Sequence, residues 1–232
     1  MTSDLELIRI HVETLFTHDA GGRLACLNEP SAELAPRFYL GRTAMGGEWR
    51  FRHDLDDESM HALESECMNE LRGDLFVDSP HGSTNYERVL ARSAPIQKKW
   101  AGPAYRFPRD LATTASTVLI TEANEDILRP HLADWLDSVA NCQPFLACMS
   151  AGRAVSVCCS GRTTPTAHEA AVETAAEFRG RGYAAQVVSA WARAVREHDR
   201  LPLYSTSWEN TASRALAAGL GLILYGTDLH IT

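Results

Sequence analysis

Several features that mark particular protein classes are missing from this 232-residue sequence. No apolar run approaches the ~18 residues that a membrane-spanning helix needs, so we expect no membrane partner. Basic residues do not predominate, because 22 Lys and Arg stand against 30 Asp and Glu, for a formal net charge of −8. Nucleic-acid binding needs a basic face, and this charge therefore argues against nucleic acid as the main partner. It favours solubility and a cationic ligand.

Cysteine and histidine lack the spacings that carry chemistry. The six cysteines form no C-x-x-C pair, and Cys158 and Cys159 lie in an apolar segment where a packing role is expected rather than a nucleophile. The nine histidines show no metal-ligand spacing, so no metal is expected. Residues 1–13 are acidic and amphipathic, unlike a signal peptide. Together with free thiols, this predicts a cytoplasmic protein.

The composition is that of a globular protein, with 45% hydrophobic and 22% charged residues. Such a chain can form one large domain or two small ones. Residues 78–108 are rich in Ser, Gly, Pro, Asn and Lys, and we interpret them as a connection between an N-terminal α/β segment, 1–110, and a C-terminal domain, 111–232. In the first segment we expect a helix over residues 5–15, a hairpin of strands 37–41 and 48–53, and an acidic helix over 54–70.

The second half alternates between strand-like and helix-like patterns. We expect strands at 117–121, 145–149, 154–159, 170–174 and 201–205, and two more at 222–225 and 229–231 around a turn at 226–228. Helices are expected around 132–139, from 183 to 195, and from 213 to 219. These elements predict an α/β (α+β) fold with a mixed, mostly antiparallel sheet and helices packed on it.

The most informative stretch is the turn between strand 170–174 and the helix that begins at Tyr183. It reads Arg179-Gly180-Arg181-Gly182. A strand that turns through glycines into a helix presents unpaired backbone N–H groups at the positive end of the helix dipole. Such a turn is suited to bind phosphate.

Residues 179–184, Arg-Gly-Arg-Gly-Tyr-Ala, fit the R/Q-x-x-G-x-G/A signature of the GCN5-related N-acetyltransferases. The following strand, the run Trp208-Glu209-Asn210 and the short helix to Gly219 have the order of that family's acetyl-CoA half. The chain therefore resembles this family over about its C-terminal half. The resemblance implies the acetyl-CoA N-acyltransferase fold, with acetyl-CoA as co-substrate and no metal.

The resemblance also implies the residues that hold the co-substrate. Backbone N–H groups of the turn would bind the diphosphate, and the pantetheine arm would pair with the main chain of the preceding strand beside Asn210 and Ser213. The implied set is Val172, Glu173, Thr174, Arg179, Gly180, Arg181, Gly182, Tyr183, Ala184, Asn210 and Ser213. Each feature has an alternative interpretation. The turn could be a simple glycine-rich connection, the strand before it an ordinary central strand, and Asn210 a helix N-cap.

Two acids stand on the otherwise apolar strand, Glu169 and Glu173, and the period of two places them on one face. A protonated amine must lose a proton before it attacks a thioester. Glu173 is our first candidate for the general base and Glu169 the second, with His168 next to them. Alternatively, one or both acids bind the cationic amine or pair with an arginine of the turn.

The family's general acid is missing from its usual place. Relatives carry a tyrosine in the helix after the asparagine, and the matching position here is Ala217. Ser213, one turn earlier, could hydrogen-bond the leaving thiolate. Tyr204 or Tyr225 could replace the tyrosine from a strand.

The resemblance points to an N-acetyltransferase that transfers acetyl from acetyl-CoA to a primary amine by direct attack. The N-terminal segment, 1–110, is expected to shape the acceptor site. Its acidic part, 54–70, favours a small cationic acceptor, with an aminoglycoside-type aminosugar, and hence antibiotic resistance, as the first candidate. The same segment could instead be a solvated helix face. The alternatives are a non-catalytic acyl-CoA-binding or regulatory module, acetylation of a peptide or protein amine, and an interaction module whose N-terminal half is functional. A homodimer also stays open.

Overall fold

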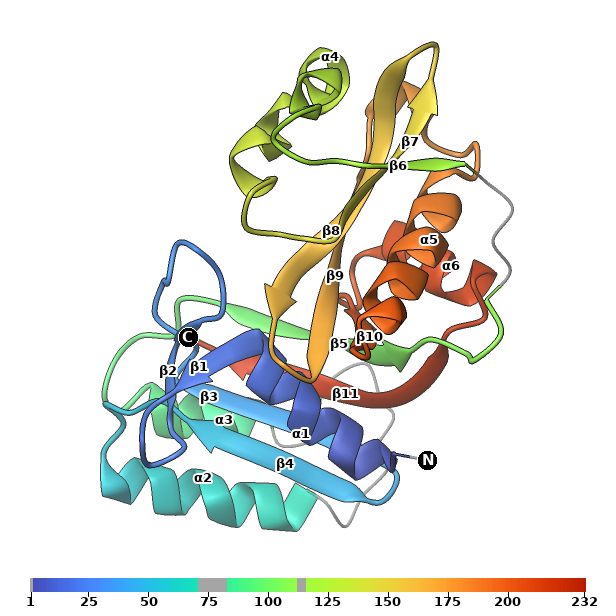
Figure 1. Ribbon diagram of the computed structural model, residues 1–232. Helices are drawn as coiled ribbons and strands as arrows, with labels where there is room; N and C mark the ends of the chain where they lie inside the picture. Colours follow the sequence, from blue (N-terminus) through green and yellow to red (C-terminus); the bar gives the residue numbers. More distant parts are fainter. Residues whose placement is uncertain (1, 71–82, 112–115) are drawn as a thin grey trace. The chain divides into compact units, whose positions relative to one another are not determined.

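The computed structural model describes residues 2–70, 83–111 and 116–232 (Figure 1). The chain divides into two compact units, which we describe separately. Unit 1 comprises Met1–Tyr105, Ser205–Thr211 and Leu224–Thr232, and unit 2 comprises Arg106–Tyr204 and Ala212–Ile223. A division near residue 110 was expected, but unit 1 also takes in the last strand of the chain. Within the described ranges, no helix is long and apolar enough to cross a membrane.

The sheet of unit 2 confirms the expected mixed, mostly antiparallel architecture. Its strand order is β10-β9-β8-β7-β6. The β9–β10 pair is parallel, and the other neighbours are antiparallel. The strands are β6 (Thr117–Leu119), β7 (Phe145–Ser150), β8 (Arg153–Thr163), β9 (Ala167–Thr174) and β10 (Leu201–Ser205).

Short helical turns pack on one face of this sheet. They are η1 (Glu125–Leu128), α4 (Arg129–Leu132) and η2 (Ala133–Ser138). The sequence predicts one helix that begins near Pro130 and continues to Val139; the helical start with Pro130 in its first turn is confirmed, but the chain continues from Ala133 as a 3₁₀ helix instead of an α-helix. The apolar spacing 132, 135, 136, 139 does not separate an α-helix from a 3₁₀ turn, because both bring residues i and i+3 to one face. These turns bury Leu128, Leu132 and Val139 against strand residues such as Phe145 and Val157.

Helix α5 (Tyr183–Glu197) packs against β7, β8 and β9 of unit 2, after the short η3 turn (Ala176–Phe178). Its apolar stripe is buried as the periodicity predicted, including Val187, Trp191 and Val195. The buried indole of Trp191 donates a hydrogen bond to Ser160 Oγ at 3.1 Å, which satisfies its polar atom. Helix α6 (Thr211–Gly219) follows β10 and confirms the expected short helix.

The sheet strands of unit 1 follow the order β4-β3-β11-β5, and β1 and β2 form a separate two-stranded ribbon. Helix α1 lies against one face, where Val12 and Leu15 pack with Tyr39. Helices α2 and α3 cover the other face, where Leu63 and Tyr86 pack with neighbours in the sheet. The bounds are α1 (Asp4–Leu15), β1 (Phe16–His18), β2 (Leu24–Leu27), β3 (Phe38–Thr43), β4 (Gly46–Phe51), α2 (Asp57–Glu70), α3 (Ser83–Leu90), β5 (Lys99–Arg106) and β11 (Ile223–Ile231).

Two sequence expectations for the sheet of unit 1 are wrong. Residues 223–231 are one strand, β11, rather than two strands around a turn at 226–228, and residues 99–106 are strand β5 rather than connection. Residues 78–82 of the predicted connection lie outside the described residues. Glycine explains both errors. Gly102 and Gly226 resemble turn signals in the sequence, but in the structure they let two backbone segments approach each other closely. A Cβ at Gly226 would lie 2.7 Å from the carbonyl oxygen of Arg42, and one at Gly102 would collide with the carbonyl of Thr206.

The acidic helix α2 is only in part a charged outer face. Its last residue, Glu70, is buried, and its two oxygens contact Arg42 Nη1 at 3.0 Å and Tyr86 OH at 2.6 Å. This carboxylate therefore belongs to the interior of unit 1, where Arg42 and Tyr86 pair with it, and not to a charged outer face.

Candidate functional site

Strands β9 and β10 pair over only part of their length. The parallel register joins Ala167 to Leu201, His168 to Pro202 and Glu169 to Leu203. Strand β9 continues to Thr174, where it pairs with β8 on its other side. In these fully described strands, residues 170–174 have no registered partner on β10. One edge of β9 thus offers main-chain donors and acceptors to a ligand.

The turn after β9 leads into helix α5, whose N-terminus has no side-chain cap. Gly180 and Gly182 both adopt left-handed backbone conformations, with φ of 74° and 82°. Gly182 is the N-cap residue of α5, and no side chain caps the helix. The N–H groups of a first helical turn have no intrahelical acceptor, so they point outward at the positive end of the dipole. A Cβ at either glycine would meet nothing closer than 3.9 Å, so a ligand can approach this backbone closely.

The two arginines of the turn add positive charge beside these N–H groups. Arg179 Nε donates to the carbonyl oxygen of Thr174 at 3.0 Å, which ties the turn to the end of β9. The guanidinium of Arg181 lies over the Phe178 ring, 5.3 Å from its centroid. Both side chains are exposed. Their positive charge favours an anionic ligand, and because both side chains are exposed, neither charge carries a cost of burial.

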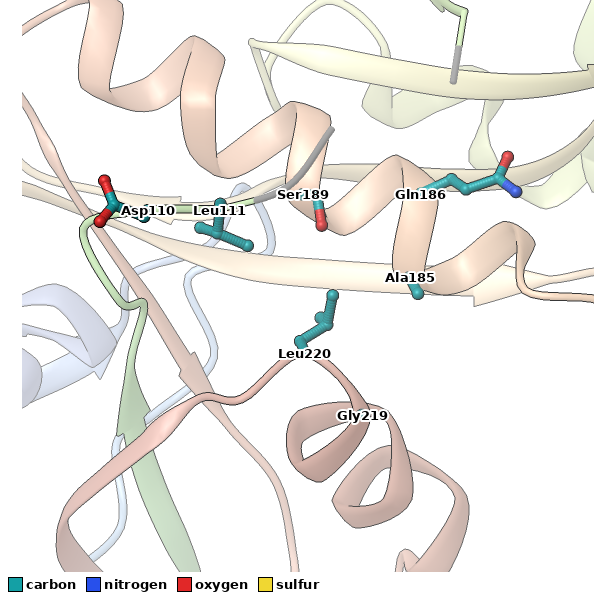
Figure 2. A pocket seen from close by; sticks show the side chains of 7 residues that line it. All are labelled: Asp110, Leu111, Ala185, Gln186, Ser189, Gly219 and Leu220. Carbon is teal, nitrogen blue, oxygen red and sulfur yellow. The ribbon is translucent and has the colours of Figure 1, made fainter. Parts of the chain in front are cut away.

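A pocket of about 300 Å³ lies along helix α5 and includes Ala185 of its first turn. Leu111, Ser189 and Leu220 face it from three segments, while Asp110 and Gln186 lie at opposite ends (Figure 2). Small residues on one face of α5 leave the space open. The lining consists of Asp110, Leu111, Ala185, Gln186, Ser189, Gly219 and Leu220.

The two strand carboxylates have different surroundings. Glu173 is exposed, and its Oε2 accepts a hydrogen bond from Trp135 Nε1 at 2.5 Å. Glu169 is 5% exposed. The adjacent His168 places its Nδ1 2.8 Å from Ser160 Oγ. Burial lowers the pKa of His168, and the nearby charges of Arg200 and His198 lower it further, so this imidazole is neutral near pH 7.

The structure brings Tyr204 and Ser213 together. Tyr204 OH lies 2.6 Å from Ser213 Oγ, and the tyrosine is 2% exposed. Tyr204 comes directly after Leu203, the last β10 residue that pairs with β9. Ala217, at the position of the missing tyrosine, is fully buried.

Two other candidate residues, Tyr225 and Asn210, belong to unit 1. Tyr225 is fully buried. Asn210 is exposed directly before α6, and its backbone N–H donates to Ser207 O at 3.1 Å.

A family model, GNAT acetyltransferase, matches residues 146–227. These residues contain the open edge of β9, the glycine turn, α5 and α6. Over these residues the chain is similar to the GNAT acetyltransferases.

Solved structures support the GNAT fold. An acetyltransferase of the GNAT family from Novosphingobium aromaticivorans is 15% identical with a TM-score of 0.50, covering 59% of this chain and 65% of that chain. A Drosophila protein is 14% identical with a TM-score of 0.50, covering 98% of this chain and 86% of that chain. At these identities the likeness shows the fold alone. No curated protein matches the sequence.

The likeness of residues 146–227 to the GNAT acetyltransferases implies an acyl-CoA co-substrate, and the residues of unit 2 fit one. The uncapped N-terminus of α5, the open space at Gly180 and Gly182, and the adjacent pocket suit a diphosphate joined to a longer arm. Among the described residues, no group of three or more His, Cys, Asp or Glu side chains is placed to hold a metal.

Sequence reasoning missed several residues of this GNAT site. It did not find Trp135, which holds Glu173, or the pocket residues of α5 and of the segment before β6. A weak signal existed for Ala185 and Ser189, which are small residues spaced by four on one helix face. No local pattern could have indicated that Trp135 contacts a residue 38 positions away.

Proposed function

We propose that this chain is an N-acetyltransferase that transfers the acetyl group of acetyl-CoA to a primary amine. The observation that carries the proposal is that unit 2 combines an open β9 edge, an uncapped start of α5 and a pocket lined by α5. The family model matches residues 146–227, the solved structures show the fold, and the activity is our inference from this arrangement.

The diphosphate would bind the backbone N–H groups of residues 179–184, with Arg179 and Arg181 beside it. The pantetheine arm would run along the main chain of Val172, Glu173 and Thr174. The pocket suits an uncharged part of the co-substrate, because the carboxylate of Asp110 at its end would repel phosphate.

In the proposed reaction a neutral amine attacks the carbonyl carbon of the thioester. The C–N bond forms, the C–S bond breaks, and the amine proton passes to Glu173 directly or through water. The Trp135 N–H occupies one oxygen of Glu173 and fixes its orientation. Glu169 is the second candidate, although its burial makes exchange of a proton with solvent harder.

The departing sulfur would receive its proton from the Tyr204–Ser213 pair. A thiolate in a buried site is poorly solvated, so a hydroxyl donor next to it lowers the barrier. Tyr204 follows the last paired residue of β10, at the closed end of the opening between the strands. Asn210 and Ser213 would contact the arm, as the resemblance implies.

The proposed acceptor is a small cationic amine, with an aminoglycoside-type aminosugar as the first to test. The net charge of −8 and the exposed acids Asp134 and Asp137 on η2 support it. Acetylation of such an acceptor would inactivate an aminosugar antibiotic. A peptide amine is the alternative. The free thiols of all six cysteines support a cytoplasmic location.

The first experiment is a thermal-shift titration with acetyl-CoA, followed by a thiol-release screen of amines. At ~100 times its dissociation constant, a ligand of the native state adds about 2.7 kcal/mol to the free energy of unfolding. A shift together with thiol release in the presence of an aminosugar supports the proposal. A chain that shows no shift with acetyl-CoA refutes it.

One observation favours a second function, a non-catalytic acyl-CoA-binding module. Ala217 fills the position where relatives carry the acidic tyrosine, and it is part of the core. A thermal shift with acetyl-CoA that survives Glu173→Gln, without thiol release for any amine, would select this alternative.

A further inference from the structure

We infer that Arg196 is a positioning residue for the co-substrate pocket. Its guanidinium clamps residues 107–109, and the next two residues, Asp110 and Leu111, form one wall of that pocket. This inference rests on the proposed function, since it assigns the pocket to acetyl-CoA.

The clamp consists of three hydrogen bonds from one guanidinium group to three consecutive carbonyl oxygens. Arg196 Nη2 donates to Phe107 O at 3.1 Å and to Pro108 O at 2.7 Å, and Nη1 donates to Arg109 O at 3.1 Å. The guanidinium is planar and presents its donors in a fixed fork, so three acceptors hold it in one orientation. Burial lowers the pKa of Arg196, but a guanidinium stays charged in any case.

Regular secondary structure does not hold the clamped segment. Residues 107–111 lie between β5 and β6 and form neither helix nor strand. Pro108 has no N–H to donate, so a sheet ladder could not hold it. The ring of Phe107 packs 6.0 Å from Trp191, which anchors the start of the segment to α5.

The pocket wall begins directly where the clamp ends. Asp110 and Leu111 line the pocket opposite Ala185 and Ser189, which lie on the same helix that carries Arg196. Helix α5 therefore forms one side of the pocket and, through Arg196, holds the other side at a fixed distance. A ligand binds a preformed pocket without the cost of ordering the wall.

Loss of the clamp should affect binding of the co-substrate and leave the chemical step unchanged. We expect Arg196→Met to raise the dissociation constant of CoA, measured by calorimetry, by about tenfold or more. KM for acetyl-CoA should rise in parallel, with kcat within about twofold, because the wall does not touch the reacting atoms. Arg196→Lys should recover only part of the affinity, since an ammonium group lacks the fork.

The matched control is Arg193→Met. Arg193 is exposed on the same helix, so this variant removes an equal charge without breaking the clamp. Its affinity for CoA should equal that of the wild type.

A double-mutant cycle covers the case in which Arg196→Met folds poorly. Leu111→Ala weakens the wall directly, and its effect on CoA affinity should be non-additive with that of Arg196→Lys, because both act through the same segment. Additive effects, or a variant Arg196→Met that binds CoA like the wild type and differs only in thermal stability, would overturn the inference. If the wild type itself does not bind CoA, the proposed function fails, and the inference fails with it.

Discussion

At the scale of single residues, Glu173 is held in place and still reachable. Its Oε2 accepts the Trp135 N–H, while the side chain remains exposed. A hydrogen bond to an ionised carboxylate is among the stronger ones in proteins, and it restricts the rotamers of the acid. The second oxygen can then accept a proton from an amine in a defined direction.

Substitution of Glu173 should separate catalysis from binding. We expect Glu173→Gln to lower kcat by about 10²- to 10⁴-fold, the usual contribution of a general base, with the affinity for CoA unchanged. Trp135→Phe removes the hydrogen bond, keeps an aromatic ring beside Phe145, and should cost about tenfold in kcat. Glu177→Gln is the control, since Glu177 pairs with His131 instead. Steady-state kinetics with an active amine would contradict this assignment if Glu173→Gln kept wild-type kcat.

The pairing of Tyr204 with Ser213 predicts a coupled loss of activity. Tyr204→Phe removes one hydroxyl group and leaves Ser213 Oγ without this partner. We expect kcat to fall about tenfold, and Ser213→Ala to fall similarly. The double variant should be no worse than either alone, because residues that act as a unit are not additive. Purely additive losses in kcat would mean that the two hydroxyl groups act separately.

Residue types could be predicted here, but their partners could not. Strand alternation placed Glu169 and Glu173 on one face, yet burial of the first and exposure of the second depend on what packs over β9. Tyr204 and Ser213 were separate candidates in the sequence. Their contact depends on how α6 folds back on β10, which no local period encodes.

At the scale of elements, strong periodicity and turn chemistry predicted well. The start of α5 at Tyr183 and the glycine turn before it are confirmed, since the apolar stripe and the left-handed glycines both act locally. Strands β5 and β11 were missed because their glycines resemble turn signals. In the folded chain Gly102 and Gly226 serve close backbone contacts with distant residues, which only the tertiary structure reveals.

Replacement of Gly182 should show that the turn binds the co-substrate. Alanine at φ 82° costs about 1–2 kcal/mol in stability, and its methyl group would enter the open space above the helix start. We expect Gly182→Ala to weaken CoA binding at least ~10-fold by calorimetry. Gly152→Ala is the matched control, because Gly152 has φ 76°, lies in the β7–β8 hairpin, and has nothing within 4 Å of its Cβ position. Equal CoA affinity in both variants would exclude the turn as the phosphate site.

At the scale of the whole chain, the family match and the fold differ in extent. The GNAT model matches residues 146–227, whereas the Drosophila structure aligns with 98% of the chain at a TM-score of 0.50. The fold of unit 1 therefore also occurs in a solved structure. Its role in shaping the acceptor site stays a prediction. The sequence could not show that β11 pairs with β3, because a contact between residues 38 and 231 leaves no local pattern.

Unit 1 joins distant parts of the chain through a buried charged cluster. Asp228 Oδ2 on β11 lies 3.1 Å from His11 Nε2 on α1 and 3.0 Å from His230 Nε2. Burial opposes ionisation of Asp228, but hydrogen bonds from His11 and His230 outweigh it and lower its pKa to about 2. The phenols of Tyr39 and Tyr225 lie nearby, and burial raises the pKa of Tyr39 well above its usual value.

This cluster predicts how the stability of the chain depends on pH. Because the folded-state pKa of Asp228 lies below the unfolded value of about 4, its contribution is present above pH ~4 and is lost as the pH falls toward 2. The contribution is about 2 kcal/mol in the free energy of unfolding. Asp228→Asn should be less stable than the wild type at pH 7, and the difference should shrink below pH ~4 as the wild-type carboxylate takes up a proton. Urea unfolding of both proteins between pH 7 and 2.5 measures that difference, and a value that stays constant over this range would show that the ionised form of Asp228 does not connect α1 to β11.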